Sequence, residues 1–316
     1  MQINFWGARG SLPYSVRSEN IRKKIKLAIV QALRSTLDKE EDIDDFISNL
    51  PFDIAGSYGG NTSCVEVRGG SEFVVCDAGS GLRDFGNCVL KSGAKPPATF
   101  HIFISHLHWD HIHGFPFFVP AFIPDNTVNI YAYHEQLEYA FVSQQNPPHF
   151  PVLLSEMPGD IRFHVLDVAK SYDIAGFHVT GMKQNHPGDS YAYCFEKDGK
   201  KFVYSTDAEH QEEIENKNFL FLKFIERADL LIFDAQYNLN DQISAKRNWG
   251  HSSNVIGVEL AVRAKVKRLC MFHHEHVLDD HQLQKHLQET LEYLEIYDDS
   301  YPLNIFLAHE GLQIDL

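Results

Sequence analysis

The sequence predicts an α/β protein whose single domain covers residues 1–316. Short apolar runs typical of strands are mixed with segments whose apolar residues repeat at helical spacing. No Pro/Gly/Ser-rich linker, internal repeat or change of composition divides the chain. Apolar residues make up 44% and charged residues 22% of it, which excludes disordered, collagen-like and coiled-coil proteins.

The expected strands are short and apolar and occur along the whole chain. They lie at residues 3–6, 100–105, 128–132, 177–182, 191–195, 202–205, 230–233, 268–272 and 304–307. Helices fit between several of these strands, notably at 254–264 and 283–295.

Residues 18–50 interrupt the strand pattern and predict an inserted helical hairpin. Ile21, Ile25 and Ile29 repeat at helical spacing, and a second short helix is expected from residue 41 until Pro51 ends it. The polar side of the first helix is basic, whereas residues 38–45 are acidic. The hairpin either packs on the domain or forms a lid or a dimer contact.

Charge and cysteine content restrict the partners and the compartment. The 28 basic and 43 acidic residues give a net charge of −15, which disfavours a groove for long nucleic acids. No apolar run is long enough to cross a bilayer, and the first residues lack the features of a signal peptide. Five widely spaced cysteines without a C-x-x-C pair indicate reduced thiols. We therefore expect a cytoplasmic protein with no membrane contact.

The strongest local signal is SHLHWDHIHG, which follows the apolar run at 100–105. It presents His106, His108, Asp110 and His111 where a strand opens into a loop. Imidazole nitrogens and carboxylate oxygens bind divalent zinc, manganese or iron. Four such groups within six residues suit two adjacent ions better than one. The alternative, a surface histidine cluster, is disfavoured by the preceding apolar strand.

The HLHWDH run is similar to the H-x-H-x-D-H signature of the metallo-β-lactamase superfamily. The resemblance implies a four-layer αββα sandwich that binds two divalent ions, zinc before manganese or iron. His106, His108 and His186 would then hold one ion, and Asp110, His111 and His273 the other. Asp207 would bridge the two ions. His274 competes with His273 for the last position, and we prefer His273 because it directly follows a strand.

Three further positions are candidates for roles beside the ions. NWGHSS resembles the G-H-S-T loop of the phosphodiesterase branch, which includes ribonuclease Z, and implies that His251 donates a proton to the leaving oxygen. Asp234, at the end of LLIFD, is a possible orienter of His251. Asp77, in DAGSG, is a candidate for orienting the ligand imidazoles. The plainer interpretations are a helix-capping loop for His251 and a strand-ending turn for Asp77.

The runs FWGARGSLP, YGGNTSCVEV, DAGSGL and PPHFPV resemble a bacterial and phage subgroup that includes cyclic-nucleotide phosphodiesterases of the anti-Pycsar type. The resemblance implies a homodimer that hydrolyses 3′,5′-cyclic nucleotides to nucleoside monophosphates, with Asp110 and His251 as catalytic residues. Two divalent ions at such a site activate water near neutral pH and stabilise phosphoryl charge.

Two alternatives of different classes remain open. A tRNA 3′ endonuclease of the ribonuclease Z type would share the metals and the GHS loop. Against it stand the acidic charge and the lack of a basic glycine/proline-rich arm between His186 and Asp207. A nucleotide-binding protein without hydrolytic activity would bind the same substrate, but it would not need a bridging carboxylate.

Overall fold

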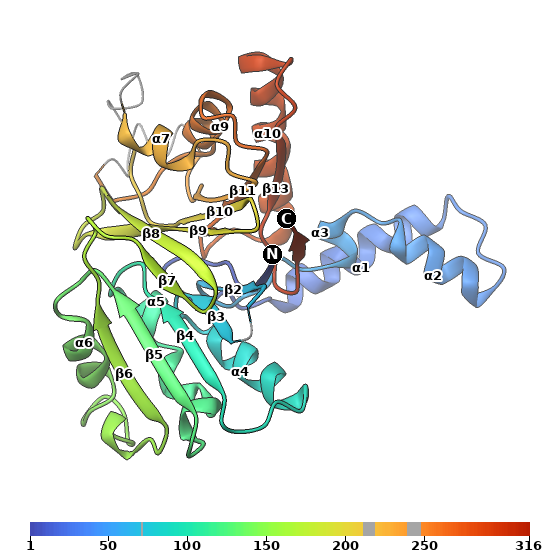
Figure 1. Cartoon of the computed structure of the whole chain (residues 1–316). Helices are drawn as coiled ribbons and strands as arrows, with labels where there is room; N and C mark the ends of the chain where they lie inside the picture. Colours follow the sequence, from blue (N-terminus) through green and yellow to red (C-terminus); the bar gives the residue numbers. More distant parts are fainter. Residues whose placement is uncertain (71, 211–218, 239–247) are drawn as a thin grey trace.

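Two mixed β-sheets, packed face to face, form the centre of the molecule (Figure 1). The computed structural model describes residues 1–316 except 71, 211–218 and 239–247. Each sheet has seven strands in this described part of the chain.

The first sheet has the strand order β14-β1-β2-β3-β4-β5-β6. Its strands β3 to β6 are parallel, whereas β14, β1, β2 and β3 pair antiparallel. The bounds are β1 (Gln2–Gly7), β2 (Cys64–Arg68), β3 (Phe73–Cys76), β4 (Thr99–Phe103), β5 (Thr127–Ala132), β6 (Asp160–Val165) and β14 (Gln313–Asp315).

The second sheet has the order β13-β12-β11-β10-β9-β8-β7. Strands β10 to β13 are parallel, and β7 to β10 are antiparallel neighbours. The bounds are β7 (Tyr172–Ile174), β8 (Phe177–Gln184), β9 (Ser190–Lys197), β10 (Lys200–Ser205), β11 (Leu230–Asp234), β12 (Arg268–Phe272) and β13 (Asn304–Leu307).

Three apolar cores separate four layers of structure. The central core joins the two sheets through residues such as Phe5, Phe103, Phe195 and Phe272. The other two cores lie between each sheet and its outer helices. Helices α4 (Gly81–Lys91), α5 (Trp109–Ile112) and α6 (Leu137–Gln144) cover the first sheet, and α7 (Leu220–Ile225), α9 (Asn254–Arg263) and α10 (Asp280–Asp298) cover the second. The predicted four-layer αββα sandwich is therefore confirmed.

The insertion forms α1 (Ser18–Ala32), α2 (Glu40–Ser48) and the short α3 (Phe52–Ala55). Helices α1 and α2 project from the side of the molecule that carries both chain termini (Figure 1). The predicted hairpin is present, but neither α1 nor α2 contains a buried residue. That the insertion and both sheets form one folding domain over residues 1–316 stays a prediction.

The parallel strands of both sheets lead into the same end of the sandwich. Strands β3 and β4 end just before Asp77 and the 106–111 loop. Strand β10 ends two residues before Asp207, β11 ends with Asp234, and β12 ends directly before His273. Parallel strands present their carboxyl ends at one edge, so this arrangement gathers polar side chains there. Asp77, Asp207 and His273 have left-handed backbones with φ of 61°, 43° and 58°, which turns the chain sharply after each strand.

All five cysteines are free thiols, and only Cys88 is not fully buried. In the described part of the chain, no helix combines the length and the apolar character needed to span a membrane.

One buried histidine makes the stability of the outer core depend on pH. His210 packs between Phe221 and Phe233, with ring centroids 4.5 and 5.7 Å away. Burial lowers its pKa from 6.5 to about 4. As the pH falls below 6.5, His210 therefore becomes protonated in the unfolded chain, whereas in the folded chain it becomes protonated only near pH 4. Acid thus favours the unfolded chain. The wild type should lose about 3 kcal/mol of stability across this window through His210.

Urea unfolding of His210→Phe between pH 7.5 and 4 tests this expectation. The variant should lose less stability than the wild type as the pH falls, because a phenyl ring cannot be protonated. His149→Phe is the matched control, since His149 is exposed. Equal acid branches for the wild type and His210→Phe would contradict the assignment.

Candidate metal centre

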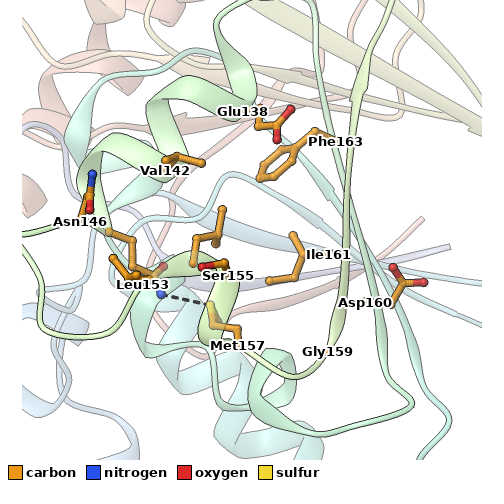
Figure 2. A pocket seen from close by; sticks show the side chains of 12 residues that line it. Glu138, Val142, Asn146, Leu153, Ser155, Met157, Gly159, Asp160, Ile161 and Phe163 are labelled. Carbon is orange, nitrogen blue, oxygen red and sulfur yellow. Dashed lines mark hydrogen bonds between the residues drawn. The ribbon is translucent and has the colours of Figure 1, made fainter.

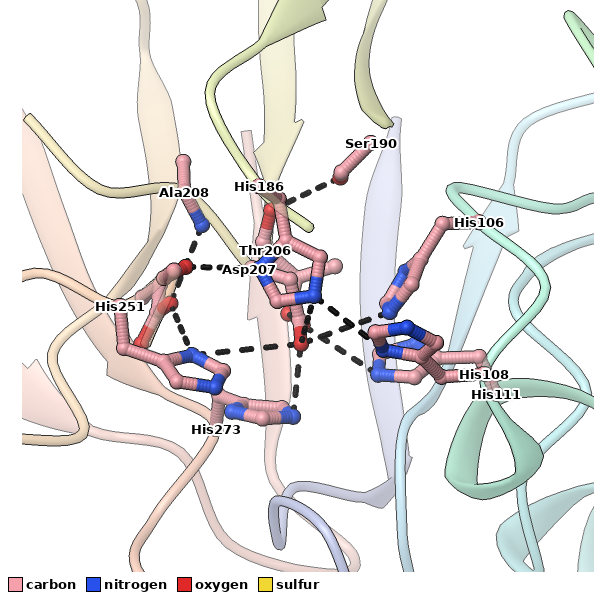
Figure 3. A network of polar contacts seen from close by, with 12 residues as sticks. His106, His108, His111, His186, Ser190, Thr206, Asp207, Ala208, His251 and His273 are labelled. Carbon is pink, nitrogen blue, oxygen red and sulfur yellow. Dashed lines mark hydrogen bonds and ion pairs between the residues drawn. The ribbon is translucent and has the colours of Figure 1, made fainter. Parts of the chain in front are cut away.

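The seven side chains predicted as metal ligands converge where the parallel strands end. Figure 3 labels all of them except Asp110. Six of them are buried, and His108 is exposed at the mouth of the cluster. They come from the loop after β4, the turn between β8 and β9, and the residues that follow β10 and β12. The candidate ligand residues are His106, His108, Asp110, His111, His186, Asp207 and His273.

The first half of the cluster contains three imidazoles. His186 Nε2 lies 3.2 Å from His108 Nδ1, and the His106 and His186 rings are 4.8 Å apart between centroids. Asp207 Oδ2 is 3.6 Å from His106 Nε2 and 3.8 Å from His186 Nε2. Three nitrogens and one carboxylate oxygen therefore surround a common point.

The second half uses the other oxygen of the same carboxylate. Asp207 Oδ1 lies 3.2 Å from His111 Nε2 and 3.3 Å from His273 Nε2. Asp110 Oδ2 is 3.2 Å from each of these two nitrogens. Asp207 thus lies between two sets of donor atoms and presents one oxygen to each set.

The donor atoms fit divalent metal ions. Ligands about 2.0–2.1 Å from a tetrahedral ion lie roughly 3.3–3.4 Å apart, close to the separations in both halves. His106 Nε2 is buried and has no hydrogen-bond partner among the described residues, as a nitrogen does when its lone pair is reserved for a metal. The buried His/Asp cluster is consistent with a dinuclear metal site.

Of the two neighbouring histidines after β12, His273 belongs to the cluster. His274 Nε2 instead lies 2.8 Å from the carbonyl oxygen of Ala308, and burial lowers the pKa of His274 to about 3. The preference for His273 agrees with this geometry.

Hydrogen bonds from outside the cluster orient the ligand rings. Asp77 Oδ2 is 2.7 Å from His111 Nδ1, and it also accepts hydrogen bonds from Tyr204 and Ser105 at 2.7 and 2.8 Å. Because Nδ1 of His111 faces this carboxylate, Nε2 is directed at the metal position. Asp77 therefore lies where an orienting residue is expected.

Several orienting groups were not predicted from the sequence. Gln236 Oε1 lies 3.0 Å from His273 Nδ1, and the carbonyl oxygen of Gly250 lies 2.8 Å from His186 Nδ1. The backbone N–H of Ser11 donates to Asp110 Oδ2 at 2.8 Å.

Gly10 and Gly250 flank the rings so closely that a Cβ atom would lie 2.5 Å from His273 and 2.3 Å from His186. The glycines in GARGS and WGHSS were the available signal.

His251 lies beside the cluster and is held by a carboxylate. Its Nδ1 is 2.8 Å from Asp234 Oδ2 and 4.0 Å from Asp207 Oδ2. Asp234 is fixed in turn by hydrogen bonds from the backbone N–H groups of Ala208 and Gln236, both at 3.1 Å. His251 lies in the loop just before α9. The side chain of Ser253, the N-cap residue of α9, accepts a hydrogen bond from the backbone N–H of Ile256 and so fixes the end of this loop. The structure thus brings Asp234 and His251 together as the sequence order suggested.

Burial and the close contact of carboxylates with imidazoles shift the pKa values of the cluster residues. Burial raises the pKa of the Asp207 carboxyl, but the surrounding imidazoles, His273 first, hold it well below its ordinary value. Burial lowers the pKa of His251, yet Asp234 more than offsets this and raises it to about 9. Burial and the neighbouring imidazoles keep the pKa of His106 well below its ordinary value, which leaves this ring neutral and able to bind a metal.

Other concave surfaces in the described part of the chain lie away from the ligand atoms. A cavity of about 550 Å³ beside α6 and β6 is lined mainly by apolar residues such as Leu153, Met157 and Phe163, and by none of the seven cluster residues (Figure 2). A groove of about 610 Å³ is lined by Trp109, His113 and Phe150. His113, which follows the metal motif, therefore faces this groove.

The fold, the cluster and a matching family together define the class of the protein: it is a metal-dependent hydrolase with two sheets flanked by helices. The family described as "Beta-lactamase superfamily domain" matches residues 73–274, so the chain belongs to the β-lactamase superfamily. Among curated proteins it is similar to ribonuclease Z of Latilactobacillus sakei subsp. sakei, with 25% identity over 226 residues. That match covers 58% of this chain and 72% of the relative.

Solved structures with the same fold cover nearly the whole chain. The metallo-β-lactamase fold protein YhfI from Bacillus subtilis has a TM-score of 0.63 and 17% identity, over 99% of each chain. Unliganded yeast PDE1 has a TM-score of 0.65 and 14% identity, over 100% of this chain and 99% of its own. These likenesses support the fold.

Removing the shared carboxylate should empty the site. Asp207→Ala should lose most bound divalent metal, because each half of the cluster loses one donor and the buried imidazoles lose their counter-charge. Metal content by mass spectrometry and hydrolysis of an aryl phosphodiester measure the effect. The exposed Asp44→Ala is the control. Normal metal content with full activity in Asp207→Ala would refute this site.

A methyl group at residue 250 should displace a candidate ligand ring without changing the chemical identity of any ligand. Gly250→Ala places a Cβ against His186 in a left-handed backbone with φ of 90°, so metal affinity should fall about 10–100-fold. Gly199→Ala is the matched control, because Gly199 is also left-handed (φ of 72°) but has open space around it. The control should cost only about 1 kcal/mol of stability. Equal metal affinity in both variants would contradict the steric argument.

Proposed function

We propose that this hydrolase is a dinuclear phosphodiesterase that converts 3′,5′-cyclic nucleotides to nucleoside monophosphates. The observation that carries the proposal is the Asp234–His251 pair, 2.8 Å apart, beside the two sets of donor atoms that share Asp207. A proton donor next to such a cluster suits a reaction in which a poor leaving group, the sugar oxygen, must be protonated.

The residues divide this chemistry among them. When bound, two divalent ions supply activated water and stabilise charge on phosphoryl oxygens. Asp207 keeps the two sets of ligands at a fixed separation. Asp110 is proposed as a catalytic residue because its carboxylate belongs to the second set and would help to hold the ion there. His251 turns Nδ1 toward Asp234, so its Nε2 is the nitrogen left to deliver a proton to the leaving oxygen.

The metals are proposed to be zinc, with manganese or iron as substitutes. Five imidazole nitrogens and two carboxylates make up the ligand set, and the cluster contains no thiolate. Zinc accepts nitrogen and oxygen donors in tetrahedral sites, and the donor spacing suits that geometry.

The substrate is proposed to be small. The net charge of −15 opposes a long polyanion, whereas a cyclic nucleotide carries a single phosphodiester charge. Residues 187–206, between His186 and Asp207, form the β9–β10 hairpin. This connection therefore contains no basic extension that could bind an RNA.

A second candidate is tRNA 3′ processing, which the ribonuclease Z name of the similar curated proteins favours. Incubation of the metal-loaded protein with precursor tRNA, cyclic mononucleotides and cyclic dinucleotides separates the candidates. Cleavage of precursor tRNA alone would replace the proposed substrate. Tight binding of a cyclic nucleotide without turnover, in the presence of metal, would instead favour a nucleotide-binding protein.

Loss of the proton donor should depend on the leaving group. His251→Ala should retain its metals but hydrolyse a cyclic nucleotide about 10²–10⁴-fold more slowly. An aryl phosphodiester with a good leaving group needs little protonation, so its hydrolysis should slow much less. Steady-state kcat on both substrates, with metal content, makes the comparison. An equal fall on both substrates would show that His251 has another role.

A further inference from the structure

Helices α1 and α2 form an arm that extends away from the sandwich (Figure 1). We call residues 18–48 the arm. Isolated helices shorter than about 12–15 residues are marginal in water, and α2 has only nine residues, none of them buried. Such a helix needs a partner surface to be stable.

One face of α1 is already attached to the body. Lys24 forms an ion pair with the buried Asp280 at the start of α10 and donates to the carbonyl oxygen of Gly56 at 2.6 Å. Asn20 donates to Asp279 at 3.2 Å. These polar contacts fix the base of the arm and the direction in which α1 points.

A second face of α1 carries an apolar stripe that is exposed to solvent. Ile21, Ile25 and Ile29 follow at four-residue intervals and are 48%, 53% and 55% exposed. On α2, Ile43 and Ile47 repeat the same spacing and are 43% and 48% exposed. Residues four apart lie on one side of a helix, so each helix carries an apolar stripe. Contiguous exposed stripes of this kind mark interaction surfaces.

Charges of opposite sign flank the two stripes. Helix α1 contains four basic residues against one acidic residue, whereas α2 contains five acidic residues and no basic one. Among the described residues, no ion pair joins α1 to α2. Lys24 is paired with Asp280, but the remaining charges give the stripe of α1 a basic border and the stripe of α2 an acidic border, and the two borders are complementary.

We propose that the arm is a dimerisation element in which α1 of one copy packs on α2 of a second copy. A two-fold axis repeats this contact, because each chain brings one basic and one acidic helix. The isoleucine stripes form the centre of the interface, and Arg22, Lys23 and Lys26 lie opposite the acidic residues of the partner's α2.

The distribution of charge favours a second copy over a membrane. A basic amphipathic helix alone would suit anionic lipid, but α2 lies in the same arm and its five acidic residues would be repelled. The chain as a whole carries a charge of −15, so two copies repel each other over most of their surfaces. The basic helix α1 attracts the acidic helix α2 of another copy, so the two copies can approach each other at the arm.

Paired charge reversals test this contact on the full-length protein. One variant is Arg22→Glu/Lys26→Glu in α1, and the other is Glu41→Lys/Asp45→Lys in α2. Each places like charges across both copies of the contact, so the dimer dissociation constant should rise at least tenfold. An equimolar mixture should form a heterodimer, because every contact then joins opposite charges. The exposed Lys91→Glu/Lys95→Glu is the matched control and should dimerise like the wild type.

Sedimentation velocity at micromolar concentration measures the masses, and circular dichroism checks that each variant is folded. Combining both reversals in one chain should also restore a dimer. A monomeric wild type, dimers that survive each single reversal, or a mixture that stays monomeric would overturn the proposal. Binding of the wild type to phosphatidylserine vesicles, lost in Arg22→Glu/Lys26→Glu while the protein stays monomeric, would assign the arm to a membrane instead.

Discussion

The carboxylate of Asp207 is the constraint on which the rest of the site depends. Its two oxygens lie 3.2–3.8 Å from four imidazole nitrogens, two on each side. A buried carboxylate is stable only when its charge is compensated, and these rings, with the metals that they fit, compensate it. The position requires β10 to end at Ser205 and the backbone at Asp207 to take a left-handed turn. One side chain therefore connects the two halves of the cluster.

A second set of groups makes this arrangement rigid. Asp77, Gln236 and the carbonyl oxygen of Gly250 each contact the Nδ1 atom of a different ligand ring, which leaves Nε2 as the metal-facing atom. Asp234 does the same for His251. The common feature is an acceptor behind the imidazole, and for Asp77 and Asp234 this acceptor is itself held by backbone N–H or buried hydroxyl groups. It determines both the ring orientation and the nitrogen that carries a proton.

Most of the candidate metal ligands could be predicted from the sequence because they come shortly after apolar strands. Apolar runs located β4, β10 and β12, and the polar residues directly after them are the ones that meet at the sheet edges. The orienting contacts were not predictable, since Gln236 and the Gly250 carbonyl act through space on rings far away in sequence. The pattern at Ile21 and Ile25 correctly indicated an apolar helix face. Periodicity alone could not show that this face points to solvent, because it reports the face and not what covers it.

Charge connects the metal centre to the arm. The acidic surface keeps polyanions and other copies of the chain at a distance, so close approach is possible only where positive charge is concentrated. Two places of different kinds in the described part of the chain suit such an approach. One is the metal-binding cluster, whose positive charge would come from its ions and which reaches the surface through His108. The other is α1, whose basic residues surround an isoleucine stripe. A compact phosphodiester matches the first in size and charge, and an acidic helix matches the second, which is why we assign a small nucleotide to the cluster and a second copy to the arm.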